Sequence, residues 1–395
     1  MITPTKQILT VNGGSSSIKF AVFKEGDFSS RSLYGHINRI GLPGTTLTFT
    51  DPGIHQSSSI PVNAISGSSV VDFLIDWLEK QPIFDRIRAV GHRIVQGMEH
   101  QGPAYITQEL VNELHRICAY DPDHLPSEMK LIETFQKRHP HLLQVACFDT
   151  AFHRTMPRVA QLLPIPRRFD AKGIRRYGFH GLSYAYLLGE LGRVAGLEAA
   201  RNRLILAHLG SGASLSAVRD GRSIDTSMGF TPTGGLPMGT RPGDLDPGVA
   251  WYLMQSESLT PQQFNHLINH ESGLLGVSET SSDMNDLLKQ QSGDSRAAEA
   301  VELFCYQTRK WVGAFTAALG GLDTLVFSGG IGENAPEVRT RICNGLNFLG
   351  IDLDQQRNAA NSPVISTDES RVAVRVIPTN EEVMIAQLVS QLLKD

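Results

Sequence analysis

The sequence lacks a surplus of charge of either sign. Its 395 residues include 36 Lys and Arg against 40 Asp and Glu, a formal net charge of −4 at pH 7. Proteins that bind nucleic acids hold the phosphate backbone with an excess of basic residues. We therefore expect no nucleic-acid partner, and any anionic ligand must be bound by a local pocket.

Cysteine is also scarce, and long apolar runs are missing. The four cysteines are far apart in the sequence and form no CxxC pair, so they predict neither a zinc site nor a disulfide framework. No apolar run approaches the roughly 20 residues that span a bilayer, and the polar first residues do not have the pattern of a secretory signal. We expect a cytoplasmic protein without a membrane partner.

The remaining composition is that of a folded protein with more than one domain. Hydrophobic residues make up 41% and charged residues 19%, which is typical of globular rather than disordered chains. A chain of this length exceeds one ordinary hydrophobic core. The composition therefore predicts two domains.

An internal repeat supports this division. An apolar strand, a Gly/Ser loop, a second strand and a charged turn occur near the start of the chain, and the same order returns about half a chain later. Such a repeat predicts two duplicated domains facing a shared cleft, although two unrelated hairpins with glycine turns are the alternative. The segments are residues 8–11, 12–17, 18–23 and 24–26, then 204–207, 208–214, 215–218 and 219–221.

Other segments alternate between helical and strand patterns, which predicts an α/β fold. We expect an N-terminal domain over residues 1–150, completed by a C-terminal helix over 382–395, and a second domain over 151–381. The expected helices are residues 69–81, 183–195, 297–319 and 381–393, and the expected strands are residues 89–95, 143–148 and 324–327.

Three Gly/Ser loops follow strands, at residues 12–17, 208–214 and 328–334. Glycines let backbone N–H groups approach an anion, and serine hydroxyls add donors. A single such loop is most often only a turn, but three favour a nucleotide site. None has the P-loop pattern or opens a helix with GxGxxG, so neither of those nucleotide folds is expected.

Charged side chains near glycines are the candidates for chemistry. Arg93 lies in an apolar strand and Arg241 in a glycine-rich loop, and arginine binds carboxylate or phosphate with paired donors. Asp149 ends a buried strand, where an acid holds Mg²⁺ or caps a following helix. His180 lies between glycines, which suits an electrostatic or a structural role. Glu381 opens the last helix, where the helix dipole alone would explain an acid.

In order along the chain, these residues resemble the acetate kinase family, which includes propionate and butyrate kinases. The match extends through nearly the whole sequence. The motifs are VNGGSSSIK (11–19), GHRIV (91–95), FDTAFH (148–153), RYGFHG (176–181), HLG (208–210), MGTR (238–241), GGIGEN (329–334) and TNEE (379–382).

The resemblance implies a duplicated fold of the actin-like, sugar-kinase and heat-shock ATPase superfamily, with a central nucleotide and substrate cleft. It implies reversible transfer of the ATP γ-phosphoryl group to a short-chain carboxylate, first of all acetate. The implied co-substrates are ATP and ADP, the metal is Mg²⁺ with Mn²⁺ as the alternative, and the assembly is a homodimer.

The resemblance also implies roles for individual residues. Arg93 and Arg241 would hold the carboxylate and the transferring phosphoryl group, and His180 would stabilise the charge on that group. Asp149 would help to organise the metal. The other implied positions are Asn12 and Glu381 at the metal, Val95, His124, Phe179 and Pro232 around the acid, and Ser15, Ser17, Lys19, His208, Gly210, Ser211, Gly212, Asp283, Gly330, Ile331 and Asn334 around the nucleotide and its phosphates.

The chain departs from the family pattern at several of these places. Asp123 stands where the family has a leucine of the acyl pocket, and Gln96 and Met98 replace two residues after Val95. An ionised carboxylate in an apolar pocket is costly unless it is paired. A kinase for a more polar small acid is therefore an alternative. A propionate kinase is a nearer one, because one methylene in an apolar pocket is worth only about 1–3 kcal/mol, and a nucleotide-binding switch or chaperone-like ATPase is an alternative of another class. Ser211 and Asn285 also depart from the pattern, near the nucleotide.

Overall fold

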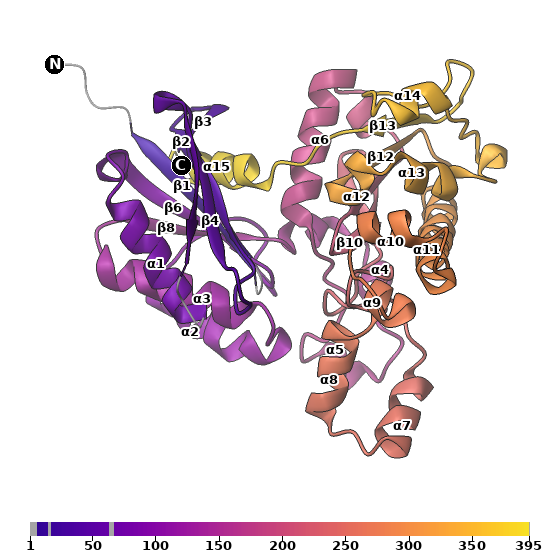
Figure 1. Cartoon of the computed structure of the whole chain (residues 1–395), viewed down its shortest axis with the longest axis horizontal. Helices are drawn as coiled ribbons and strands as arrows, with labels where there is room; N and C mark the ends of the chain where they lie inside the picture. The colour runs from indigo at the N-terminus through magenta and orange to yellow at the C-terminus, as the bar shows by residue number, and fades with distance from the viewer. Residues whose placement is uncertain (1–5, 15–16, 63–66, 395) are drawn as a thin grey trace. The chain divides into compact units, whose positions relative to one another are not determined.

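The computed structural model describes residues 6–14, 17–62 and 67–394. The chain divides into two compact units, the first formed by Met1–Ala151 with Asn380–Asp395 and the second by Phe152–Thr379 (Figure 1). Glu381 therefore groups with the first unit, although the sequence analysis assigned it to the second domain. Ser15, expected to bind phosphate, lies outside the described residues.

The first unit is built on one mixed sheet with the strand order β5-β4-β3-β2-β1-β6-β8-β7. Strands β1 to β5 pair in an antiparallel manner, whereas β1, β6 and β8 run parallel to one another. The strands are β1 (Gln7–Gly13), β2 (Ser17–Lys24), β3 (Asp27–Asn38), β4 (Thr46–Asp51), β5 (Gln56–Pro61), β6 (Ile87–Ile94), β7 (Ala104–Tyr105) and β8 (Leu143–Phe148).

Helices cover both faces of this sheet. Because successive strand residues point to opposite faces, His92 of β6 packs against Phe135 of α3, while Gly91 faces Ile385 and Val389 of α15. Helix α1 joins α3 in the core through the apolar positions that its helical period predicts. The helices are α1 (Gly67–Glu79), α2 (Gln108–Ile117), α3 (Leu125–Arg138) and α15 (Glu381–Leu392).

The second unit repeats the central part of the first sheet. Its order is β11-β10-β9-β12-β13, with antiparallel pairs on one side of β9 and parallel pairs on the other. The same arrangement relates β3, β2, β1, β6 and β8, so the predicted duplicated α/β architecture is confirmed. The strands are β9 (Leu204–Leu209), β10 (Ala213–Arg219), β11 (Arg222–Thr226), β12 (Thr324–Ser328) and β13 (Ala373–Val376).

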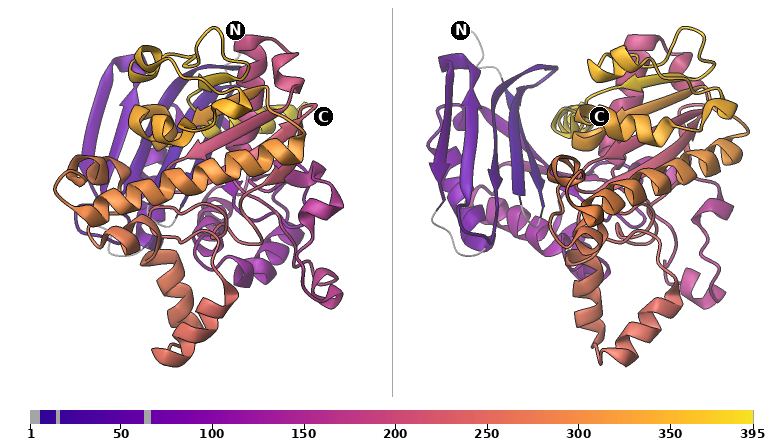
Figure 2. Two further views of the ribbon diagram at one scale, coloured as in Figure 1. Left: turned by 90° about the vertical axis from the view of Figure 1, so that its right-hand side faces the viewer. Right: turned by 45° about the vertical axis from the view of Figure 1, so that its right-hand side comes forward.

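The long helix α11 packs along this second sheet (Figure 2). It buries Phe304, Val312 and Phe315 on one side, as its apolar composition predicts. The remaining helices are α4 (Arg158–Gln161), α5 (Arg167–Asp170), α6 (Gly181–Ala195), α7 (Pro247–Ser256), α8 (Pro261–His270), α9 (Gly273–Ser278), α10 (Met284–Gln290), α11 (Ser295–Leu319), α12 (Gly329–Asn334), α13 (Pro336–Cys343) and α14 (Gln355–Ala359).

Short 3₁₀ helices complete the secondary structure. They are η1 (Pro52–Ile54), η2 (Phe84–Arg86), η3 (Cys118–Tyr120), η4 (Ala151–Thr155), η5 (Ala199–Arg201) and η6 (Asn347–Leu349). Among the helices that the structure describes, none combines the length and the apolar character that crossing a membrane requires.

The expectation of a Gly/Ser loop over residues 328–334 was wrong, because Gly329–Asn334 form helix α12. Tertiary contacts outweigh the poor helix propensity of its glycines. At its start, the Gly329 amide donates to the Glu333 carboxylate, and at its end the buried Arg339 donates to the carbonyl oxygens of Gly332 and Glu333. These bonds satisfy backbone amide and carbonyl groups at the helix ends that have no partner within the short helix.

Candidate active site

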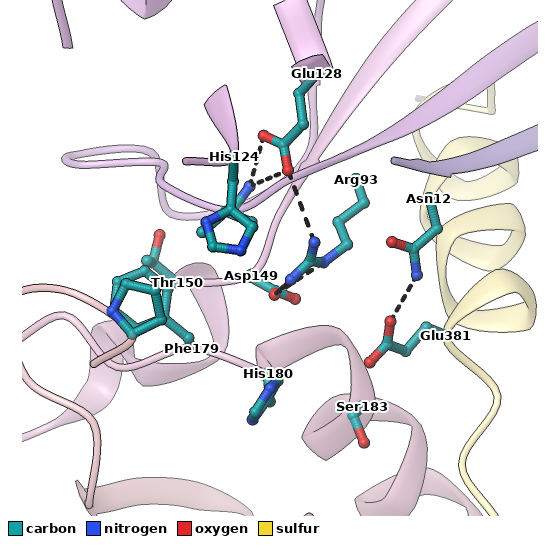
Figure 3. Close-up of polar contacts among 12 residues, drawn as sticks. Asn12, Arg93, His124, Glu128, Asp149, Thr150, Phe179, His180, Ser183 and Glu381 are labelled. Carbon is teal, nitrogen blue, oxygen red and sulfur yellow. Dashed lines mark hydrogen bonds and ion pairs between the residues drawn. The ribbon is translucent and has the colours of Figure 1, made fainter. Parts of the chain in front are cut away.

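Arg93 and Asp149 form a buried ion pair at the carboxyl ends of β6 and β8. These neighbouring strands are parallel, so residues at their ends meet at one edge of the sheet. Asp149 Oδ2 accepts from Nη2 of Arg93 at 2.6 Å and from Nε at 3.0 Å (Figure 3). The Asp149 side chain is fully buried, whereas the Arg93 side chain keeps 15% exposure. Asp149 therefore fixes the orientation of a guanidinium whose side chain is mostly buried.

A second acid, Glu128 of α3, lies on the other side of Arg93. Its Oε1 is 3.7 Å from Nη1 of Arg93, and its side chain is 1% exposed. Burial raises the pKa of Glu128 to about 8, against the opposing effects of the Arg93 charge and the Val95 amide. For Arg93 itself burial favours a lower pKa, but the charges of Asp149, Glu381 and Glu128 outweigh it and raise the pKa. Arg93 is thus a permanent cation among acids.

Asn12 and Glu381 meet beside this cluster within the first unit. Asn12 lies near the end of β1, and its Nδ2 donates to Oε2 of Glu381, the first residue of α15, at 2.7 Å (Figure 3). Burial and the charge of Asp149 raise the pKa of Glu381, while Arg93 and Lys19 act in the opposite direction. A buried acid such as Glu381 beside the charge of Asp149 is a setting in which a divalent cation would be stabilising.

The oxygen atoms of Asp149, Glu381 and Asn12 are of the kind that Mg²⁺ prefers. Within the ranges that the structure describes, no three His, Cys, Asp or Glu side chains form a metal cluster. Mg²⁺ commonly uses one or two carboxylates and completes its octahedron with water and phosphate. The residues present therefore fit a Mg²⁺ ion bound together with a phosphate substrate.

Two expected acyl-pocket residues belong to the first unit, Val95 just after Arg93 and His124 just before α3. Val95 is buried directly after β6, and its amide donates to Glu128. His124 precedes α3, where its Nδ1 is 2.8 Å from a carboxylate oxygen of Asp121. The departing residue Asp123 is half-buried. A histidine held by an acid in this way can present its other ring nitrogen to a ligand.

Two more departures from the family pattern have structural consequences in this region. Gln96 is buried, and its Oε1 accepts from the backbone amide of Met98 at 3.0 Å. Met98 has a left-handed backbone with φ of 47°. Between them, the Gly97 amide donates to Thr150 beside Asp149. The side chain of Gln96 thus supports the turn that follows Val95.

His180 is the central polar residue of the second unit. It has φ of 58° immediately before α6, a conformation that is uncommon outside glycine. Its Nδ1 is 2.8 Å from Oγ of Ser214, which also contacts the Tyr184 hydroxyl at 2.5 Å. The ring stacks on His208 of β9 with centroids 4.3 Å apart. The left-handed backbone and these contacts fix the orientation of the ring.

Arg241 and His180 both approach Gly212, in the loop between β9 and β10. A Cβ atom on Gly212 would lie 2.9 Å from Nη2 of Arg241 and 3.2 Å from Nε2 of His180. Nη1 of Arg241 donates to the carbonyl oxygen of Pro232 at 2.7 Å, and the Ser211 carbonyl accepts from Gly239. The structure thus brings together the expected phosphoryl-binding groups of the second unit around one small residue.

The other expected residues lie in several elements. Phe179 is buried, and its carbonyl contacts His153. Gly330, Ile331 and Asn334 belong to α12, and Asp283 caps the start of α10 by accepting from the Asn285 amide. Ser17 and Lys19 lie on β2, His208 on β9, and Gly210 in the following loop.

Sequence reasoning missed three polar residues beside these sites. Glu128 was not considered, although it lies four positions after His124 in the first turn of α3. Ser183 bridges Nδ1 of His208 and the Thr379 hydroxyl, each at 2.8 Å. Glu333 accepts from the amides of Gly329 and Thr379. For the last two no pattern in the sequence gives a signal, because their partners are distant along the chain.

Comparison with known proteins agrees with this arrangement of residues. The sequence model of the Acetokinase family matches residues 7–387. An acetate kinase of Rhodopseudomonas palustris is 44% identical over 392 residues, which are 98% of each chain. The crystal structure of Porphyromonas gingivalis acetate kinase has 37% identity and a TM-score of 0.87, covering 98% of this chain and 100% of that one.

A propionate kinase from Francisella tularensis is similar to the same degree, with 35% identity and a TM-score of 0.90 over 97% of this chain and 98% of that one. The fold resemblance thus holds for enzymes named after two different acids. Both the family match and the matched structures span nearly the whole chain. The chain therefore belongs to the Acetokinase family.

Proposed function

We propose that this protein transfers the γ-phosphoryl group of ATP to the carboxylate of acetate, forming acetyl phosphate and ADP, and catalyses the reverse reaction. The observation that carries the proposal is Arg93, a cation held by the buried Asp149 with 15% of its own side chain exposed. Such a group offers directed donors to a small carboxylate. The family membership supplies the reaction class.

The groups in the two units suit this reaction. A carboxylate nucleophile is already ionised at neutral pH, since its pKa is about 4, so no general base is needed. Phosphoryl transfer instead requires in-line positioning and neutralisation of charge on two anions. In this proposal Arg93 binds the acid, Arg241 binds the transferring phosphoryl group, and Nε2 of His180 donates to its equatorial oxygens.

Mg²⁺ belongs to the same proposal, with Mn²⁺ as an alternative. The ion would neutralise charge on the phosphates of the nucleotide. Asp149, Glu381 and Asn12 would hold it in the first unit. Ser17, Lys19 and the residues of α12 would contact the nucleotide and its phosphates, at positions given by the family motifs.

The test is the formation of acyl phosphate, trapped with hydroxylamine, from ATP and Mg²⁺ with acetate, propionate, butyrate and hydroxylated acids. Acetate is expected to react best. Arg93→Ala should lower kcat by at least about 100-fold with ATP binding retained, because one preorganised donor group contributes that much to charge stabilisation. The matched control is Arg193→Ala, whose side chain is 70% exposed and pairs with Glu190. Wild-type rates in Arg93→Ala, or no product with any acid, would contradict the proposal.

Asp123 decides between acetate and a more polar acid. If its carboxylate faces the acid, then Asp123→Leu should improve the kcat/KM for acetate and propionate, because an apolar tail gains an apolar neighbour. A kcat/KM of the wild-type enzyme that is higher for hydroxylated acids than for acetate would favour the polar substrate. Discrimination between acetate and propionate is expected to be modest, since one methylene is worth only about 1–3 kcal/mol.

We further propose that the protein forms a homodimer in the cytoplasm. Helix α7 exposes two neighbouring aromatic side chains, Trp251 at 70% and Tyr252 at 67%, and such residues are enriched in interfaces. Trp251→Ser should convert the dimer to a monomer in light scattering, whereas Phe348→Ser, at an equally exposed position of η6, should not. A monomeric wild-type protein would contradict this part of the proposal.

A further inference from the structure

One buried acid has no role in the reaction proposed above. Glu128 extends from the first turn of α3 toward β6, and its two carboxylate oxygens accept from the Val95 amide at 3.3 and 3.1 Å. The same carboxylate lies 3.7 Å from Nη1 of Arg93 (Figure 3). The Glu128 side chain thus contacts two of the residues expected to bind the substrate: Arg93, expected at the substrate carboxylate, and Val95, expected at its tail.

We propose that Glu128 is a positioning residue for the acid substrate, which holds the Val95 backbone in place and controls whether the Arg93 guanidinium is available to an incoming carboxylate. This inference rests on the proposed function. It assigns Glu128 no contact with the reacting atoms. Its effect should therefore appear in the binding of the acid rather than in the transfer step.

The charge balance around Arg93 supports this role. Asp149 already compensates the guanidinium through two short hydrogen bonds. A second ionised carboxylate at Glu128 would leave Arg93 outnumbered by acids, and a substrate carboxylate would then be repelled. A neutral Glu128 leaves more of the positive charge of the guanidinium to the substrate. It still accepts the Val95 amide through its carbonyl oxygen, so the backbone stays in position.

The surroundings of Glu128 favour the neutral form at physiological pH. The charged or titratable groups around it are Arg93 on β6, Asp149 after β8, Asp121 before α3 and Cys118 in η3. Burial raises the pKa of Glu128 to about 8 and the charges of Asp121 and Asp149 add to this, although Arg93 and the Val95 amide act against it. Above that pH the carboxyl group loses its proton and competes for Arg93.

The expected size of the effect follows from the fraction of the competent form. The apparent affinity of a ligand falls in proportion to that fraction. If only neutral Glu128 allows the acid to bind, the KM for the acid should rise about tenfold between pH 7 and pH 9. The KM for ATP should not follow, because Glu128 contacts none of the residues expected at the nucleotide.

The experiment measures the KM for the acid and for ATP between pH 6.5 and 9.5 in the full-length enzyme. Glu128→Gln keeps the shape of the side chain and an oxygen that accepts from the Val95 amide, but it cannot ionise. The KM of this variant for the acid should therefore not change with pH. Glu133→Gln, on the same helix with a 43% exposed side chain, is the matched control and should rise like the wild type. A rise of equal size in Glu128→Gln would overturn the proposal.

A second variant tests the hold on Val95. Glu128→Ala removes the acceptor, so it should raise the KM for the acid about tenfold or more at every pH, with a smaller change in kcat. A KM for the acid like that of the wild type at pH 7 would overturn this part. If the wild-type enzyme turns over acetate and its KM for acetate does not change with pH, only the role of Glu128 is contradicted. No turnover of any acid contradicts the proposed function itself.

Discussion

Helix α15, which begins with Glu381, packs closely against β6 at Gly91 because glycine has no side chain. A Cβ atom at this position would lie 2.5 Å from Cγ2 of Ile385 and 2.7 Å from Cγ2 of Val389. Both contacts are far inside van der Waals distance. Both neighbours are β-branched, and such residues have essentially one rotamer in a helix. Gly91→Ala must therefore displace the helix rather than a side chain.

Overpacking of a core by one methyl group costs about 1–3 kcal/mol, and we expect a loss of this size in the free energy of unfolding. The measurement is urea unfolding followed by circular dichroism. Gly102→Ala is the control in the same unit, because a Cβ atom at Gly102 would meet nothing within 4 Å. That control should change the free energy of unfolding by less than about 1 kcal/mol.

The cause of the loss can be isolated in a second background. The pair Ile385→Leu and Val389→Ala removes both Cγ2 atoms that would collide. In this background Gly91→Ala should be neutral or stabilising, since alanine restricts the unfolded chain more than glycine does. Gly91→Ala should thus be destabilising only where both Cγ2 atoms are present, and this difference measures the coupling between the contacting residues. Equal losses in both backgrounds would refute the reasoning.

Two further predictions concern the metal and the nucleotide. Glu381→Gln removes a buried acid that is expected to hold the metal beside Asp149, so the Mg²⁺ concentration for half-maximal activity should rise at least about tenfold. An unchanged Mg²⁺ titration would contradict the metal role. Arg339→Met leaves the carbonyls of Gly332 and Glu333 without their buried donor, so it should lower the free energy of unfolding by about 2–4 kcal/mol. It should also raise the KM for ATP but not the KM for the acid. Equal changes in the two KM values would contradict a specific role of α12 at the nucleotide.

The elements that could be predicted from the sequence are those with a strong local pattern. The strand before Asp149 and the helix that begins at Glu381 follow from runs of apolar residues and a helical period. Helix α12 could not be predicted in this way. Its stability comes from Arg339 and from bonds between distant segments, while its local sequence favours a loop.

The candidate site was predictable as a set of residues but not as an arrangement. The motifs single out Arg93 and Asp149, yet their 2.6 Å ion pair depends on the parallel pairing of β6 and β8, which local patterns do not encode. Glu128 escaped notice because an acid in the first turn of a helix is ordinary at the surface. Only its burial against β6 distinguishes it.

The last helix also bears on how the protein is made. Strands β1 and β6 leave the ribosome early, but α15, which covers their Gly91 face, is synthesised only after all of residues 152–379. While the second unit is being synthesised, the apolar sheet face of the first unit is therefore not covered by α15. Exposed apolar surface of this kind makes partly folded chains prone to aggregation. Moving the segment of α15 ahead of β1 by circular permutation would let the first unit close before the second is begun.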